Sequence, residues 1–152
     1  MISVLITASD DAQALGRLLS ALVPAAADGL VRQVAVVGAV GPSAALADDA
    51  GADLFAAGAF AEAFEHARGP WVAGLPLTGA LVGDWMDVLA AHLSREPPAP
   101  ARLVAKGGLF AGRTPEGWLI EKRRAPSTPL AEQDLHRLTR RAGRVLRLLE
   151  RR

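Results

Sequence analysis

Hydrophobic residues along the chain follow two spacings, which together predict alternating strands and helices. Short apolar runs such as residues 34–37 and 71–75 are typical of strands buried in a parallel sheet. Between these runs apolar side chains recur every three to four residues, as at Leu15, Leu18 and Leu22, which is the period of one helix face. The pattern predicts strands at residues 2–7, 33–37, 52–55, 71–75, 102–105 and 117–121, and helices at residues 12–23, 43–50, 60–67, 85–93 and 129–150.

This order of elements predicts the fold class. Strands that alternate with helices form a single α/β domain with a mostly parallel sheet and helices on both faces. Pro24 is expected to end the first helix, and Pro42 to begin the second. The proline-rich residues 96–100 are too short to separate two domains and are interpreted as a surface crossing.

Composition limits the chemistry. The chain has 152 residues, of which 51% are hydrophobic and 22% charged, as in a globular protein. It has no cysteine, which excludes disulfides, thiolate nucleophiles and cysteine-bound zinc. Aromatic residues make up only 5% and tyrosine is absent, so a base-stacking platform and nucleic-acid binding are not expected. With neither a basic leader nor an apolar run of membrane-spanning length, the sequence predicts a cytoplasmic protein without a transmembrane segment.

Charge is distributed unevenly along the chain. Residues 1–120 carry 7 Lys and Arg against 12 Asp and Glu, whereas residues 121–152 carry 10 against 4, so a segment of net charge −5 precedes one of +6. The second segment includes the predicted helix 129–150, for which Thr128 is the expected N-cap and Pro129 the first residue. A basic amphipathic helix either is a solvated surface or contacts an anionic surface or partner.

Four segments resemble one known family in the same order, and the second of them, residues 33–52, resembles its second strand and helix. The opening residues 2–22 resemble its first strand and helix, and residues 68–85, with Arg68-Gly69-Pro70-Trp71 and the later Asp84-Trp85, resemble its central strand and following helix. Residues 129–135, Pro-Leu-Ala-Glu-Gln-Asp-Leu, resemble its acceptor-side helix with a Glu-Asp motif. The chain thus resembles a compact family 2 glycosyltransferase, and the resemblance implies the GT-A fold of nucleotide-diphospho-sugar transferases.

The resemblance also assigns roles to individual positions. It implies nucleotide contacts from Thr7, Ala8 and Asp11 after the first strand and from Gly38 after the second. Lys106, which precedes Gly107 and Gly108, either approaches a phosphate or belongs to a hairpin turn. For the acceptor-side helix, Glu132 or Asp134 is the candidate general base, and the alternative is that both stabilise the start of the helix.

The chain departs from the family at its carboxylates. Pro76, Leu77 and Thr78 occupy the positions of the Asp-x-Asp metal motif, and Gly38 stands where a carboxylate contacts the base. Divalent cations that bind diphosphates need hard oxygen ligands, which these residues lack. No metal site or cofactor is therefore expected, and Mg²⁺ or Mn²⁺ binds only if other residues rebuild the site.

The remaining chemical groups do not form a motif. His66, His92 and His136 fall on three different elements without ligand spacing and are interpreted as surface or packing residues. The sequence also lacks a phosphate-binding loop and a nucleophile elbow.

Three hypotheses follow. The first is a degenerate glycosyltransferase, a pseudoenzyme with reduced or no transfer activity that keeps a binding role for a nucleotide or nucleotide-sugar. The second is an active transferase that uses Asp11, Glu132 or Asp134. The third is a non-enzymatic α/β protein whose basic helix binds a partner or an anionic surface. Self-association into a homo-oligomer fits the alanine-rich surface.

Overall fold

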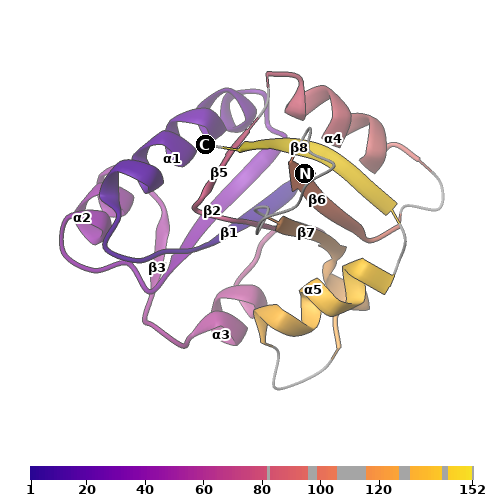
Figure 1. Cartoon of the computed structure of the whole chain (residues 1–152). Coiled ribbons are helices and arrows are strands. Elements are labelled where there is room, and N and C mark those ends of the chain that lie inside the picture. Colours follow the sequence, from indigo (N-terminus) through magenta and orange to yellow (C-terminus); the bar gives the residue numbers. More distant parts are fainter. Residues whose placement is uncertain (82, 96–98, 106–115, 127–130, 142–143, 152) are drawn as a thin grey trace.

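A single eight-stranded mixed sheet runs through the molecule, in the strand order β3-β2-β1-β4-β7-β6-β8-β5 (Figure 1). The structure is a computed structural model that describes residues 1–81, 83–95, 99–105, 116–126, 131–141 and 144–151. The strands are β1 (Ile2–Thr7), β2 (Val31–Val37), β3 (Asp53–Phe55), β4 (Trp71–Leu75), β5 (Gly79–Leu81), β6 (Ala101–Ala105), β7 (Glu116–Glu121) and β8 (Arg144–Arg151).

Parallel and antiparallel strands occupy different halves of this sheet. β1 pairs in parallel with β2 and β4, and β2 pairs in parallel with β3. β7 pairs antiparallel with both β4 and β6, and β8 pairs parallel to β6 and antiparallel to β5. The parallel half therefore agrees with the predicted α/β architecture, and the late strands make the complete sheet mixed.

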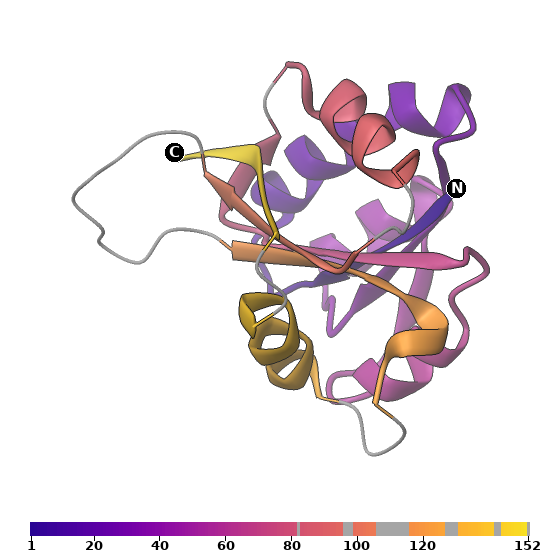
Figure 2. The same cartoon turned by 90° about the vertical axis from the view of Figure 1, so that its right-hand side faces the viewer.

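Helices cover both faces of the sheet, as the alternation of elements predicts. They are α1 (Ala12–Ala27), α2 (Pro42–Asp49), α3 (Phe60–Glu65), α4 (Trp85–Leu93) and α5 (Glu132–Arg141), with a 3₁₀ turn at Lys122–Arg124. The core on one face joins side chains of α1, α2 and α4 to the sheet, and the core on the other face joins those of α3 and α5 (Figure 2).

The spacing of apolar residues explains how α1 packs. Leu15, Leu18 and Leu22 are almost fully buried against the sheet, at 0–2% exposure. The helix begins after Asp11, whose side chain accepts a hydrogen bond from the Ala14 N–H group at 2.8 Å. This N-cap satisfies a backbone donor that the first turn otherwise leaves unpaired.

The predicted terminal helix at 129–150 is wrong beyond Arg141. Residues 144–151 form β8, which lies between β6 and β5 in the sheet. The two strands adjacent to β8 offer backbone hydrogen bonds on both sides, and this tertiary pairing overrides the helical spacing of Leu138, Val145 and Leu149. The expected N-cap Thr128 and first residue Pro129 lie outside the described residues.

One smaller expectation also fails, and one short strand was not expected. The first helix continues past Pro24 to Ala27, because Pro24 lies in the last turn and the fully buried Ala25 holds that turn on the core. The three-residue strand β5 follows the turn at residues 76–78, and the sequence pattern gives no sign of so short a strand. Within the part of the chain that the structure describes, none of the helices combines the length and apolar character needed to cross a membrane.

Candidate functional site

The carboxyl ends of β1 and β2 bring three of the predicted nucleotide-binding residues together. Ala8 follows β1 and donates its N–H to the Val37 carbonyl at 2.9 Å. Gly38 follows β2 and donates its N–H to the Phe55 carbonyl, also at 2.9 Å. A Cβ atom on Gly38 would lie 3.4 Å from the Ala8 carbonyl oxygen, so the two residues are neighbours across the strand ends. Thr7, Ala8 and Gly38 therefore lie together at one edge of the sheet, the carboxyl edge of β1 and β2.

Gly38 is required by its backbone conformation. Its φ of +81° lies in the left-handed region, where a side chain is strained. A Cβ atom there would also contact the Ala8 carbonyl oxygen and Ala57, at 3.4–3.8 Å. The edge is lined by small residues and by the backbone groups of Ala8 and Gly38.

Glu132 reaches this edge from the start of α5. Its Oε2 atom accepts a hydrogen bond from the Thr7 hydroxyl at 2.7 Å, across 125 residues of sequence. Its Oε1 atom lies 3.4 Å from the Trp118 indole nitrogen, which donates a longer and weaker bond. Two residues that the family resemblance assigns to different roles, Thr7 to the nucleotide and Glu132 to catalysis, are thus in direct contact.

Trp118 is a residue of this cluster that the sequence reasoning missed. It lies on β7, is fully buried, and packs edge-on against Phe60 with ring centroids 6.0 Å apart. Its ring occupies the space over Gly74 of β4, where any Cβ atom would overlap the indole. The glycine at position 74 opposite a tryptophan was the available signal, but only the β4–β7 register reveals it.

Asp134 serves the helix rather than the edge. Its Oδ2 accepts the Ala131 N–H at 3.3 Å, and its Oδ1 lies 3.6 Å from the Arg137 guanidinium. A carboxylate that reaches back to the residue before the first turn stabilises a helix start. Of the two motif carboxylates, Glu132 thus contacts the edge and Asp134 stabilises the helix start. The intervening Gln133 is exposed.

The remaining predicted nucleotide residues do not join the cluster in the described contacts. Asp11 is exposed and its carboxylate is engaged as the N-cap of α1. Lys106 lies outside the described residues.

Comparison with solved structures identifies the architecture. No family model matches the sequence, and no curated protein sequence matches it. The fold is similar to that of glucosyl-3-phosphoglycerate synthase from Mycobacterium tuberculosis, with a TM-score of 0.73 at 15% identity over 100% of this chain and 72% of that one. The chain has a GT-A glycosyltransferase fold. Two complexes of the same synthase agree with this assignment. The complex with Mn²⁺, UDP and glucosyl-3-phosphoglycerate has a TM-score of 0.70 at 16% identity, covering 100% of this chain and 72% of that one. The complex with Mn²⁺ and UDP-glucose has a TM-score of 0.71 at 16% identity, covering 100% of this chain and 71% of that one.

The turn between β4 and β5 is where the resemblance places the metal motif of this GT-A fold. The turn is closed by a hydrogen bond from the Gly79 N–H to the Pro76 carbonyl at 3.2 Å. Thr78 supplies one hydroxyl, and Leu77 and Pro76 supply no side-chain ligand. Among the described residues no three His, Cys, Asp or Glu side chains gather to hold a metal ion. The residues present therefore do not fit a hard divalent cation.

The three histidines belong to different elements: His92 packs in the core on α4, His66 follows α3, and His136 lies on α5 one turn after Glu132. His92 on α4 is buried beside Trp71, and its Nε2 donates to the Ala99 carbonyl at 2.8 Å. Burial lowers the pKa of His92 below its usual 6.5, the charges of Arg144 and Arg95 lower it further, and the Ala99 hydrogen bond opposes them. Burial likewise lowers the pKa of His136 on α5, against the opposing charges of Glu132 and Glu116.

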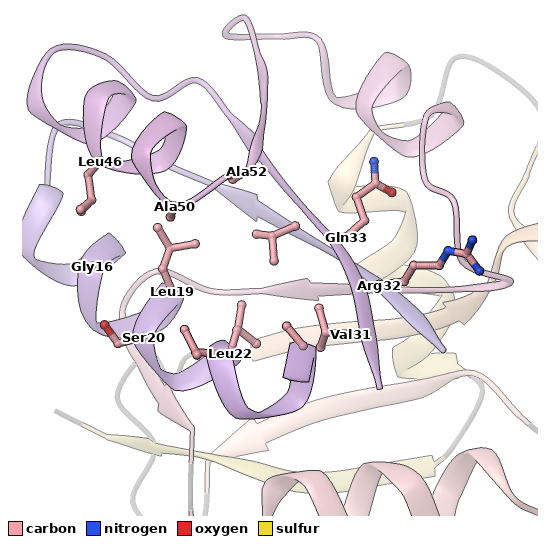
Figure 3. Close-up of a pocket in the computed structure, with 14 residues that line it drawn as sticks. Gly16, Leu19, Ser20, Leu22, Val31, Arg32, Gln33, Leu46, Ala50 and Ala52 are labelled. Atoms are coloured by element: carbon pink, nitrogen blue, oxygen red, sulfur yellow. The ribbon is translucent and has the colours of Figure 1, made fainter. Parts of the chain in front are cut away.

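A separate cavity of about 470 Å³ lies between α1, α2 and β2. Its lining is mainly apolar, with Leu19, Leu22 and Val31 directed toward the space, while Arg32 and Gln33 point away from these side chains (Figure 3). Gln33 instead contacts Asp53, with 2.6 Å between its Nε2 and the carboxylate. This cavity is distinct from the edge formed by Thr7, Ala8 and Gly38.

Proposed function

We propose that this chain is a degenerate glycosyltransferase-like domain that binds a nucleoside diphosphate or nucleotide-sugar and has reduced or no metal-dependent transfer activity. One contrast carries the proposal: the edge at Thr7, Ala8 and Gly38 is assembled, whereas Pro76, Leu77 and Thr78 replace the metal motif. The synthase of similar fold has been solved in complexes with Mn²⁺ that contain UDP or UDP-glucose.

The chemistry of the edge suits a nucleotide. The exposed Thr7 hydroxyl lies beside the small residues Ala8 and Gly38, and it can donate to a carbonyl or phosphate oxygen. Without a divalent cation, however, the negative charge that develops on a leaving diphosphate lacks its main stabilisation. Binding is therefore better supported than transfer.

An active transferase is the second candidate, and the position of Glu132 favours it. Glu132 is half-buried and reaches the nucleotide edge, while Asp11 and Asp134 are engaged at helix starts. In this candidate Glu132 accepts the proton of an acceptor hydroxyl as a general base. Loss of transfer in Glu132→Gln, with transfer retained in Asp134→Asn, is the result expected of it.

The third hypothesis relied on a long basic helix, which the structure does not contain. The α5 helix ends at Arg141, and Arg144 belongs to β8. On α5, Arg140 donates to Glu116 at 2.7 Å and Arg137 pairs with Asp134. The basic residues are thus divided between elements and partly neutralised. Self-association and a cytoplasmic location stay predictions.

Calorimetric titration with UDP and GDP, each with and without Mn²⁺, tests the proposal. We expect metal-independent binding tighter than about 1 mM, equivalent to about −4 kcal/mol. Absence of binding at millimolar nucleotide would overturn the proposal. Binding that requires Mn²⁺ would overturn its metal-free part and favour the active enzyme.

A pair of glycine variants locates the site. Gly38→Ala and Gly29→Ala both place a side chain at positive φ, +81° and +73°, and so carry comparable backbone strain. A Cβ at Gly29 has no neighbour within 4 Å, whereas one at Gly38 enters the edge beside Ala8. We expect only Gly38→Ala to weaken nucleotide binding. Equal effects of the two variants would place the site elsewhere.

A further inference from the structure

The Thr7 hydroxyl has a single proton, and Glu132 uses it. The 2.7 Å separation between the Thr7 Oγ1 and the Glu132 Oε2 is that of a hydroxyl donating to a carboxylate. A hydroxyl can donate to one acceptor at a time. Thr7 therefore cannot give this proton to Glu132 and to a bound ligand together.

The second contact of Glu132, with the Trp118 indole, is weak, and the indole is fixed in place. The Trp118 nitrogen lies 3.4 Å from the Oε1 atom, near the limit of a hydrogen bond. Trp118 is fully buried over Gly74 and packed on Phe60, so its indole is not free to follow the carboxylate. Glu132 itself is only half-buried and has solvent to turn toward. Thr7 is thus its principal partner at the edge.

We propose that Glu132 is an internal competitor for the nucleotide site, holding the Thr7 hydroxyl until a nucleotide displaces it. This inference rests on the proposed function and adds a regulation to that site. An oxygen of the nucleotide then accepts the hydrogen bond from the Thr7 hydroxyl, and the Glu132 carboxylate turns away from Thr7.

The competition predicts which substitutions improve binding. Glu132→Gln keeps the shape of the side chain but removes the charge and weakens the bond to Thr7. We expect UDP to bind about three- to tenfold more tightly to this variant, the range of one charge-assisted hydrogen bond partly exposed to water. Thr7→Val removes the contested hydroxyl, so Glu132→Gln added to Thr7→Val is expected to change UDP affinity by less than about twofold.

Asp134→Asn is the matched control for charge. It removes the same charge from the same first turn of α5, but Asp134 accepts from Ala131 and has no bond to Thr7. We expect it to change UDP affinity by less than about twofold. An equal gain in Asp134→Asn and Glu132→Gln, or a gain from Glu132→Gln that survives Thr7→Val, would overturn the competition and leave only a general charge effect.

The Trp118 indole resonance reports the movement directly. In an amide and indole NMR spectrum, assigned by Trp118→Phe, saturating UDP should shift the Trp118 N–H signal of the unchanged protein because Glu132 leaves it. The same shift should be smaller in Glu132→Gln. UDP binding with an unmoved Trp118 signal and unaltered affinity in Glu132→Gln would overturn this inference alone. Absence of UDP binding in every variant would overturn the proposed function as well.

Discussion

The ring of Trp118 lies directly against the backbone of Gly74, in the space that a side chain at position 74 would occupy. The two residues are paired across the β4–β7 ladder. A Cβ atom on Gly117, the residue before Trp118, would likewise overlap the Gly74 carbonyl oxygen. This close approach of β7 to β4 brings the indole nitrogen to Glu132. The candidate site is consequently built on a packing arrangement in the core.

Gly74→Ala is expected to destabilise the fold strongly. The new methyl group overlaps a fully buried ring that cannot move aside, so we expect a loss of about 3 kcal/mol or more in the free energy of unfolding, measured with denaturant. Gly83→Ala is the control, because Gly83 is exposed and a Cβ there meets nothing within 4 Å. Trp118→Leu should partly rescue Gly74→Ala. Additive losses in the double variant would contradict the overlap.

The sequence predicted the elements that local pattern determines. The strand at 71–75 matches β4 from Trp71 to Leu75, and helix α4 begins at Trp85 and ends at Leu93 as the spacing of its apolar residues indicates. Both have a strong local pattern. Where one segment was compatible with two structures, as at residues 144–151, pairing with β6 and β5 decided the outcome.

The site could be predicted only in part, for the same reason. The family resemblance singled out Thr7 and Glu132 separately, but their hydrogen bond joins residues 125 positions apart and depends on how α5 docks on the sheet. Trp118 carried no chemical signal in the sequence. Its proximity to Glu132 follows from the missing side chain of Gly74, which only the strand register makes visible.

Ser3→Ala is expected to destabilise the start of the sheet. The buried Ser3 hydroxyl donates to the Gln33 Oε1 and accepts the Gly69 N–H, both at 2.9 Å. Removal of the hydroxyl leaves the Gly69 N–H without this acceptor, which costs about 1–3 kcal/mol. Ser94→Ala removes an exposed hydroxyl bonded to the Ala90 carbonyl and should change stability by less than about 0.5 kcal/mol. Equal losses in the two variants, measured by urea unfolding, would contradict the role of the buried network.

Stability should fall as the pH drops below about 6.5, because burial lowers the pKa of both His92 and His136 in the folded chain. The unfolded chain then binds protons more readily than the folded chain. The stabilisation from the uncharged histidines is therefore complete above their usual pKa of 6.5, and it is lost as the pH falls toward their pKa values in the folded chain. Each histidine contributes a slope of up to about 1.4 kcal/mol per pH unit in that window. Urea unfolding between pH 5 and 8 measures it. His92→Gln and His136→Gln should each reduce the slope, and a slope unchanged in the double variant would assign it to other groups.

A divalent-cation dependence should appear when the turn after β4 is given carboxylates. Pro76→Asp combined with Thr78→Asp places two hard ligands where the chain has an imino ring and a hydroxyl. Without metal, these charges repel the diphosphate, so UDP should bind more weakly than to the unchanged protein. With Mn²⁺, UDP affinity of the double variant should rise at least about tenfold, or about 1.4 kcal/mol, while that of the unchanged protein stays the same.

The corresponding double asparagine variant separates ligand charge from backbone effects. Pro76→Asn with Thr78→Asn changes the same two positions and also removes the proline ring, but it adds no carboxylate. We expect its UDP affinity to be independent of Mn²⁺ in calorimetric titration. If Mn²⁺ improved UDP binding equally in the asparagine variant and in the unchanged protein, the cation would be held by groups other than this turn. A response confined to the aspartate variant would show that the GT-A scaffold presents this turn to a bound diphosphate, and that carboxylates at positions 76 and 78 are sufficient to make UDP binding depend on the cation.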